Sequence, residues 1–391
     1  MKKVLLTYGY HKSGHYSAVR AIEEELIERG MCAQICNLWT GKTKTIDELF
    51  TIFRSFAAKQ VKMVPDFLIS KELLEIIAEE LPFDKNLSSY DAIISTHHYS
   101  SSVIAAHKVK QNCNTLLIDV HTDYTPHPLI MHPLINFYTG AIPLEDAGSE
   151  LNKRIVTTGI PVRKSFQYYG TPKEKKIMIM GGADGFGELE KMVEFVASIN
   201  NIYEPTVICG RNTLSYKRLK RKFPKYQILG YVADLSEQFK TAEFVLTKAS
   251  GLTVAEALNS ECIPLFTPPI LFWEYEASKY ISAHGAGICL PDFGPNSIKT
   301  INAVFSSDDY KQALRQQIRQ LAKPNATKDI VDLIEHKGRT ETRSNPQEKM
   351  ITEMKRYYEV FSSAQDLPKL AKYLTEQIEG WLRKHEPNNS S

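Results

Sequence analysis

The chain has 391 residues, of which 43% are hydrophobic and 24% charged, and these values argue against a disordered, collagen-like or coiled-coil protein. The 48 Lys and Arg nearly balance the 45 Asp and Glu, and a net charge of +3 argues against a generally basic surface for nucleic acid. The length indicates two domains, at about 150 residues each. Six scattered cysteines indicate reduced thiols and a cytoplasmic protein.

Apolar runs in the sequence are all short. The run after Lys3 is too short for a signal peptide, and no stretch approaches the ~18 apolar residues of a membrane span. We therefore expect a soluble protein, or one that rests on a membrane surface.

Short β-branched strands alternate with longer helical patterns along the whole chain. The strands predicted are Val4–Thr7, Ala92–Thr96, Leu116–Asp119, Ile155–Thr157, Ile177–Met180, Val207–Cys209, Ile228–Leu229, Phe244–Thr247, Ile263–Phe266 and Ile288–Leu290. Continuous apolar strands separated by helices are typical of a parallel sheet covered on both faces. We predict an α/β protein with two doubly wound domains, 1–165 and 166–336, followed by a helical extension at 337–391.

Residues 42–62 have a helical pattern that mixes aromatic and basic side chains. The residues that carry this mixture are Phe50, Phe53, Arg54, Phe56 and Lys59. Such a helix either packs on its own core with a solvated basic face or lies in a membrane interface.

Three strands are each followed by a glycine-containing loop and a helix. The loops are Gly9–His15, Gly181–Gly187 and Thr247–Thr253. A helix start presents unpaired backbone N–H groups at the carboxyl end of a parallel strand, which favours an anionic or polar ligand. In the third loop Lys248 suits a diphosphate, and Glu256 could accept hydrogen bonds from ribose hydroxyls. Each loop could also be a structural turn that binds no ligand.

The ordered set of motifs resembles one glycosyltransferase family. This family contains the processive diacylglycerol glucosyltransferases, monogalactosyldiacylglycerol synthase and, more distantly, the peptidoglycan lipid-intermediate N-acetylglucosaminyltransferase. The matching stretches are Gly9–His15, Thr122-Asp123-Tyr124 with His127, Thr158–Arg163, Gly181–Gly187, Val207–Asn212, Leu229–Val232, Thr247-Lys248 and Gly251–Leu258.

The resemblance implies a GT-B fold, in which two Rossmann-like domains face each other across a cleft. The first domain would bind a lipid acceptor such as diacylglycerol, and the second a UDP-sugar, with inversion at the anomeric carbon and neither metal nor cofactor. Gly14 and His127 would lie on the acceptor side, and His15 and Asp123 near the reaction centre. The donor would be held by Arg163, Gly182, Gly185, Arg211, Tyr231, Lys248, Gly251, Leu252, Thr253, Glu256, Glu274 and Glu276.

Transfer of a sugar requires a base for the acceptor hydroxyl and stabilisation of the departing UDP. His15 or Asp123 could be the base, and we prefer His15 with Asp123 orienting the groups around it. Lys248, Arg163 and helix starts could stabilise the diphosphate. The 42–62 helix falls where lipid glycosyltransferases of this family dock on membranes, which favours an anionic membrane surface as a partner, at the inner face of the cell membrane.

The chain departs from the family pattern in the segment that contacts the donor sugar. Trp273 stands where a Gln is expected and Ala277 where an Asn is expected, although Glu274 and Glu276 could still contact the sugar. A non-catalytic nucleotide-sugar-binding protein on the same fold is therefore an alternative.

A metal-dependent hydrolase is a further alternative. Its candidate zinc ligands are Asp119, His121, Asp123, His127 and His132, with His97-His98 after a neighbouring strand. In a hydrolase, however, the nucleotide-like loops of the second half would have no role.

Overall fold

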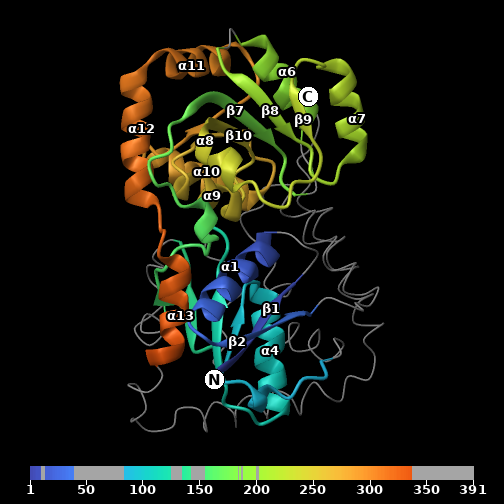
Figure 1. Cartoon of the computed structure of the whole chain (residues 1–391), viewed down its shortest axis with the longest axis vertical. Helices are drawn as coiled ribbons and strands as arrows, with labels where there is room; N and C mark the ends of the chain where they lie inside the picture. Colours follow the sequence, from blue (N-terminus) through green and yellow to red (C-terminus); the bar gives the residue numbers. More distant parts are fainter. Residues whose placement is uncertain are drawn as a thin grey trace, which may run out of the picture.

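The computed structural model describes residues 1–9, 14–38, 83–124, 134–141, 155–183, 185, 188–199 and 202–336. Two α/β domains follow one another along the long axis of the molecule (Figure 1). Each domain contains a sheet of six strands, and every pair of neighbouring strands is parallel.

The first sheet has the order β2-β1-β3-β4-β5-β6 and the second the order β12-β11-β10-β7-β8-β9. The strands of the first sheet are β1 (Lys3–Tyr8), β2 (Cys32–Asn37), β3 (Ala92–Ser95), β4 (Leu116–Val120), β5 (Phe137–Thr139) and β6 (Ile155–Val156). Those of the second are β7 (Glu174–Met180), β8 (Glu204–Ile208), β9 (Gln227–Leu229), β10 (Ala242–Thr247), β11 (Ile263–Phe266) and β12 (Ile288–Cys289).

The α-helices are α1 (Gly14–Glu28), α4 (His98–Lys110), α6 (Leu189–Ser198), α7 (Thr213–Lys222), α8 (Ser236–Thr241), α9 (Gly251–Asn259), α10 (Phe272–Ala283), α11 (Pro295–Ser306), α12 (Asp308–Leu321) and α13 (Ala326–His336). Two short 3-10 helices, η2 (Leu87–Ser89) and η3 (Lys164–Phe166), complete the described elements.

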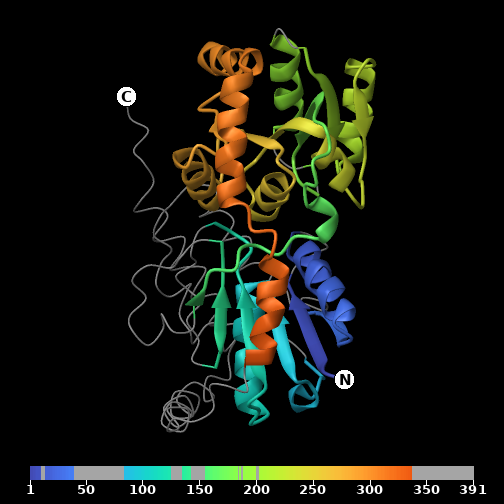
Figure 2. The ribbon, with the colours of Figure 1, turned by 60° about the vertical axis from the view of Figure 1, so that its left-hand side comes forward.

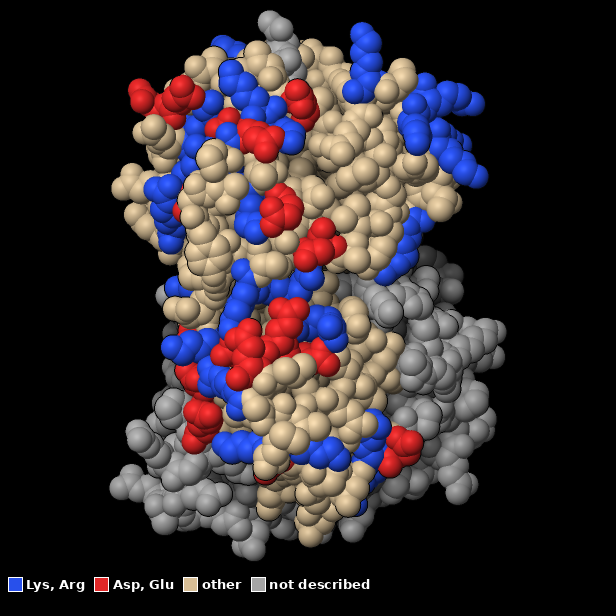
Figure 3. All heavy atoms as spheres, viewed as in Figure 1, with Lys and Arg blue, Asp and Glu red and all other residues tan. Residues whose placement is uncertain are grey.

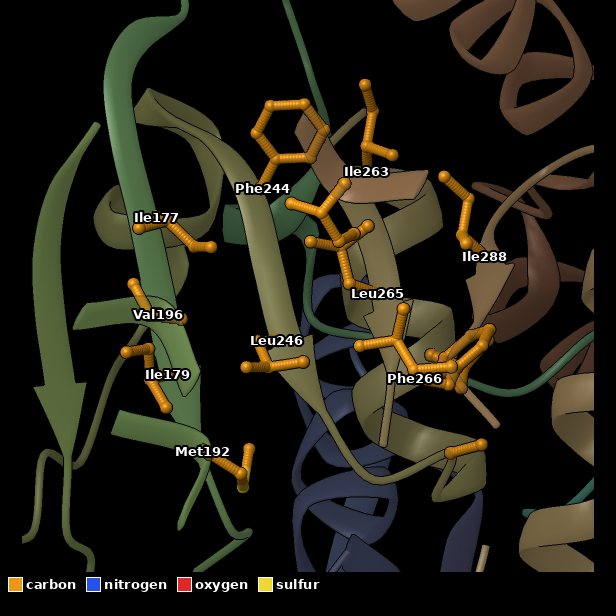
Figure 4. Packing of buried hydrophobic residues seen from close by; sticks show 14 of the residues in the cluster. Ile177, Ile179, Met192, Val196, Phe244, Leu246, Ile263, Leu265, Phe266 and Ile288 are labelled. Atoms are coloured by element: carbon orange, nitrogen blue, oxygen red, sulfur yellow. The ribbon is translucent and has the colours of Figure 1, made fainter. Parts of the chain in front are cut away.

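Alternation of side chains across the strands produces a hydrophobic core on each face of each sheet. In β1, Val4 and Leu6 join one cluster while Leu5 joins the cluster on the opposite face. In the second sheet, Ile177, Phe244 and Leu265 point into the cluster that α6 covers (Figure 4). The continuous apolar strands read from the sequence are therefore strands buried on both faces.

Every predicted strand is present, and two further strands were missed. The edge strand β2 is half-buried along its whole length and mixes polar Gln34 and Asn37 with apolar residues, so it lacks the continuous apolar signal. β5 has only three residues. The prediction of an α/β fold with two doubly wound domains is confirmed.

The assignment of residues 326–336 to the second domain requires a correction. α13, which was assigned to the second domain, returns to the first and lies along its sheet (Figure 2). Ile330, Val331 and Ile334 are buried in the same cluster as Val4 and Ile22. The amphipathic pattern of α13 was visible in the sequence, but a pattern does not show which sheet its apolar face covers.

Within the residues that the structure describes, the chain crosses between the domains twice, and the two crossings lie against each other. A Cβ on Gly159 would lie only 2.3 Å from Cβ of Lys323, and Gly159 has a φ of +94°. The side chain of Gln167 donates to the carbonyl of Pro324 over 2.9 Å. No helix among the described residues is long and apolar enough to cross a membrane.

Candidate active site

His15 lies in the first turn of α1, beside the carboxyl ends of β1 and β3. Its Nδ1 is 2.7 Å from the carbonyl oxygen of Thr96 and 3.0 Å from the hydroxyl of Thr122. Because a carbonyl can only accept, Nδ1 carries the hydrogen and Nε2 of the neutral ring keeps its lone pair. Burial lowers the pKa of His15, although the nearby Asp123 opposes this effect. The neutral ring therefore has a free nitrogen base at Nε2.

Two further histidines and a buried carboxyl group surround His15. The ring of His97 stands edge-on to His15, with 4.6 Å between the ring centroids. Burial and the neighbouring His15 lower the pKa of His121 to about 4, and its Nε2 lies 3.6 Å from Oδ2 of Asp119. Burial raises the pKa of Asp119 to about 7, although the hydroxyl of Ser101 donates to it. This part of the first domain is thus polar but poorly solvated.

Asp123 connects this cluster to the second domain. Its carboxylate accepts a hydrogen bond from the backbone N–H of Gly251, the first residue of α9. Burial raises the pKa of Asp123, while His15, this N–H group and Lys248 act in the opposite direction. A negative charge at a helix N-terminus is favoured by the helix dipole.

The two domains come into close contact at Gly251. A Cβ there would lie 1.9 Å from the carbonyl oxygen of Thr122, so only glycine permits the approach. Leu252 is the nearest neighbour that a Cβ on Gly14 would meet, at 3.4 Å. The predicted reaction residues His15 and Asp123 and the predicted donor loop therefore converge where the domains meet.

Beside this point, Lys248 of the loop after β10 lies against the glycine-rich loop after β7. A Cβ on Gly182 would lie 3.5 Å from Cε of Lys248. Nζ of Lys248 is 3.5 Å from Oε1 of Glu274, a residue only 3% exposed. The second oxygen of Glu274 accepts from the backbone N–H groups of Ile270 and Leu271 at the start of α10. Glu274 therefore has a structural role, because it holds the start of α10 and contacts Lys248. Glu276 is half-buried on the same helix.

The glycine-rich loop after β7 packs against the loop after β8. A Cβ on Gly185 would lie 2.1 Å from the carbonyl oxygen of Cys209, and one on Gly210 would lie 2.3 Å from that of Ala183. The backbone N–H of Arg211 donates to Ala183 over 3.0 Å. Gly182, Gly185 and Gly210 all have positive φ. The glycine at 185 thus serves contact between two backbones, whereas Gly182 borders Lys248.

Two further cationic side chains predicted for the donor site are Arg211, in the loop after β8, and Arg163, directly before η3. The guanidinium of Arg211 is 4.6 Å from the ring centroid of Tyr231, which is 53% exposed. Arg163 donates to Asp234 over 3.1 Å. Burial raises the pKa of the half-buried Glu256 to about 8, and nearby Arg163 partly offsets this. Thr253 is buried, and its hydroxyl accepts from that of Ser250.

Several predicted residues lie outside the described part of the chain. They are His127, Phe50, Phe53, Arg54, Phe56, Lys59 and the extension at 337–391. Conversely, the sequence assigned no role to Thr96 or Tyr124, or to the hydroxyl of Thr122. Tyr124 is buried in the core of the second domain, although it follows a strand of the first. The Thr122-Asp123-Tyr124 motif could have indicated a role for Tyr124 and for the Thr122 hydroxyl.

Among the described residues, no group of three or more His, Cys, Asp or Glu could hold a metal ion. Asp119 and His121 are close, but Asp123 is directed at α9. Of the zinc ligands considered from the sequence, His127 and His132 are not among the described residues.

No family model matches the chain. It is, however, 23% identical over 388 residues to the processive diacylglycerol beta-glucosyltransferase of Bacillus cereus strain ATCC 14579, covering 88% of this chain and 96% of the relative. A relative of the same name from Bacillus cytotoxicus is 23% identical over 387 residues, with the same coverage.

Solved glycosyltransferase structures have the same fold. MurG of Acinetobacter baumannii has a TM-score of 0.57 at 17% identity, over 86% of this chain and 99% of MurG. The spinosyn rhamnosyltransferase SpnG, complexed with thymidine diphosphate, has a TM-score of 0.54 at 14% identity, over 85% of this chain and all of SpnG. The chain has the GT-B fold of these glycosyltransferases. The family resemblance predicted from the motifs is confirmed.

Proposed function

We propose that the chain transfers a hexose from a UDP-sugar to a lipid acceptor such as diacylglycerol, with inversion and without a metal ion or cofactor. The observation that carries this proposal is the convergence of His15, Asp123 and the start of α9 at the domain junction. The names of the relatives support the lipid acceptor.

In the proposed reaction, Nε2 of His15 removes the proton from the acceptor hydroxyl. The hydroxyl oxygen then forms a bond to the anomeric carbon from the face opposite UDP, and the bond from that carbon to the diphosphate oxygen breaks. A single displacement of this kind inverts the anomeric centre. Asp123 would stabilise the imidazolium that forms, because opposite charges attract strongly at a buried site.

The negative charge on departing UDP would be stabilised by the N–H groups at the start of α9, by Lys248 and by Arg163. The backbone N–H of Gly251 donates to Asp123 in the structure without ligand. When UDP-sugar binds, this N–H group would donate to the diphosphate instead. Arg211 and Tyr231 would flank the uracil, and Glu256 would accept hydrogen bonds from the ribose.

The proposed site of action is the inner face of the cell membrane, where the chain would be a peripheral, cytoplasmic protein. The acceptor resides in the bilayer, and the donor is a water-soluble nucleotide. The aromatic and basic residues at 42–62 provide one proposed contact with anionic lipid.

A donor screen tests the function directly. The purified chain is incubated with diacylglycerol in detergent micelles and with UDP-glucose, UDP-galactose or UDP-N-acetylglucosamine, and the lipid products are measured by mass spectrometry. We expect one donor to yield a lipid heavier by one sugar, with a β-linkage by NMR, and equal yield after treatment with EDTA. His15→Ala is the negative control.

Other results would overturn parts of the proposal. UDP binding without product from any donor would support a non-catalytic nucleotide-sugar-binding protein, which the role of Glu274 at the start of α10 would help to explain. Loss of activity with EDTA, restored by a divalent ion, would show that the reaction needs a metal.

A further inference from the structure

One segment of the second domain carries a strong excess of positive charge. Between Glu204 and Asp234 there is no acidic residue. The same segment contains seven basic residues, here called the α7 basic patch: Arg211, Lys217, Arg218, Lys220, Arg221, Lys222 and Lys225. The other 41 Lys and Arg are outnumbered by the 45 Asp and Glu, so this segment alone makes the chain net positive.

The α7 basic patch faces solvent. α7 buries only Leu219, and all seven basic side chains are exposed. Lys and Arg gather over this helix in the space-filling view (Figure 3). The long, flexible side chains can therefore adapt to an external surface.

Few acidic groups neutralise the α7 basic patch. Arg218 lies 3.6 Å from Glu190, and Lys222 pairs with Glu194, both on α6. Lys217, Arg221 and Lys225 make no ion pair with any described residue. Like charges on one short helix repel each other, so the arrangement costs stability unless an external anion compensates it.

Exposed apolar side chains accompany these charges. Leu214, in the first turn of α7, is 58% exposed, and Tyr231 is 53% exposed beside the Arg211 guanidinium. Basic residues next to exposed Leu and Tyr are typical of helices that lie on anionic bilayers, because headgroups accept the charges and the interface accepts the apolar groups. A soluble anion or a nucleic-acid backbone would leave Leu214 in water.

We propose that the α7 basic patch is a contact site for an anionic lipid bilayer. This inference deepens the proposed function and rests on it for the lipid acceptor. α7 begins at Thr213, directly after the turn that carries Arg211. Docking of α7 therefore holds the proposed uridine-binding end of the donor site near the membrane surface, where the acceptor resides.

The test measures binding to vesicles without donor or turnover. Wild-type full-length chain is sedimented with vesicles of equal parts phosphatidylglycerol and phosphatidylcholine, and with vesicles of phosphatidylcholine alone. The variant Lys217→Gln/Arg221→Gln/Lys225→Gln removes the three unpaired charges. At about fivefold per charge, we expect its partition onto anionic vesicles to fall about a hundredfold.

The matched control removes three exposed lysines elsewhere, as Lys175→Gln/Lys299→Gln/Lys328→Gln. We expect its vesicle partition to stay within about threefold of wild type, as generic charge loss acts weakly at a distance. Leu214→Ser, added to the α7 variant, should lower its partition onto anionic vesicles by a few-fold more. The melting temperature of every variant checks that the fold is retained.

Three results would overturn the inference. The first is equal vesicle binding by wild type and the α7 variant. The second is an equal loss in the control variant. The third is tighter binding of the wild type to single-stranded RNA than to anionic vesicles, lost in the α7 variant. Transfer to diacylglycerol in neutral detergent should survive in the α7 variant, which separates failure of this inference from failure of the proposed function.

Discussion

The two domains have the same kind of sheet but use the carboxyl ends of their strands differently. In the first domain these ends carry a polar cluster of the half-buried His15 and the buried His97, Asp119 and His121. Burial shifts the pKa values of His15, Asp119 and His121 toward the neutral forms. In the second domain the strand ends carry glycine turns and more exposed cations such as Arg211. This difference suits the proposed division of roles, in which the first domain transfers a proton in a poorly solvated site and the second binds an anion.

The largest effect should come from the proposed base. His15→Ala removes Nε2, and we expect kcat to fall by about 10² to 10⁴ because general-base catalysis contributes that much. The affinity for UDP, measured by calorimetry, should change little. The control is His284→Ala, an exposed histidine at the end of α10. Retention of full activity in His15→Ala would assign the base to another residue.

Gly251→Ala tests the contact between the two regions. The added methyl group would overlap the carbonyl oxygen of Thr122, so the domains must separate locally. We expect kcat/KM to fall about a hundredfold, since a displacement of about 1 Å between reacting groups has this effect. Gly294→Ala, at the start of α11, is a control in which only a flexible Asp292 side chain must adjust. Wild-type kinetics in Gly251→Ala would mean that the domains do not approach this closely during catalysis.

The pH dependence of kcat/KM should reflect the burial of His15. Its pKa is lowered from the ordinary value of 6.5, and the base is active only when neutral. We therefore expect the midpoint of the acid limb to lie below pH 6.5, with the rate falling toward tenfold per pH unit in acid. The profile is measured on the wild-type chain, and circular dichroism checks that the chain stays folded at each pH. A rate that already decreases above pH 7 as the pH is lowered would contradict this assignment.

Glu256→Ala should weaken UDP binding about tenfold, the effect of losing a hydrogen bond to a charged or strongly polar group. The raised pKa of Glu256, about 8, means that the carboxyl is largely protonated at neutral pH without ligand. Glu256→Gln, which resembles that form, should therefore lose less affinity than Glu256→Ala. Unchanged affinity in both variants, measured by calorimetry, would remove Glu256 from the ribose site.

The smallest effect should come from the exposed pair at the edge of the donor loops. Arg211→Ala removes the cation from the ring of Tyr231, and we expect UDP affinity to fall two- to fivefold, about the strength of an exposed cation–π contact. Arg218→Ala, farther along α7, is the control and should leave UDP affinity unchanged. A loss above a hundredfold in Arg211→Ala would place Arg211 on the diphosphate instead.

The sequence was most informative where chemistry is local. Strand β7 and the loop after it were evident from continuous apolar residues followed by glycines. The roles predicted for Lys248 and Glu256 from their position after a strand stay predictions. Contacts between distant segments could not be predicted. Gly185 reads as a ligand-binding glycine, yet it serves the approach of two backbones. Tyr124 reads as part of a first-domain motif, yet its ring lies in the second domain's core.

The double crossing of the chain at Gly159 and Lys323 makes each domain a composite of separate segments. A single proteolytic cut at one crossing would leave the two halves held together by the other crossing and by α13. Removal of α13 would uncover Val4, Ile22 and their neighbours on the first sheet. The first domain therefore cannot be produced intact by truncating the chain after residue 165. A circularly permuted chain that begins at residue 326 and ends near 165 would be needed to isolate it.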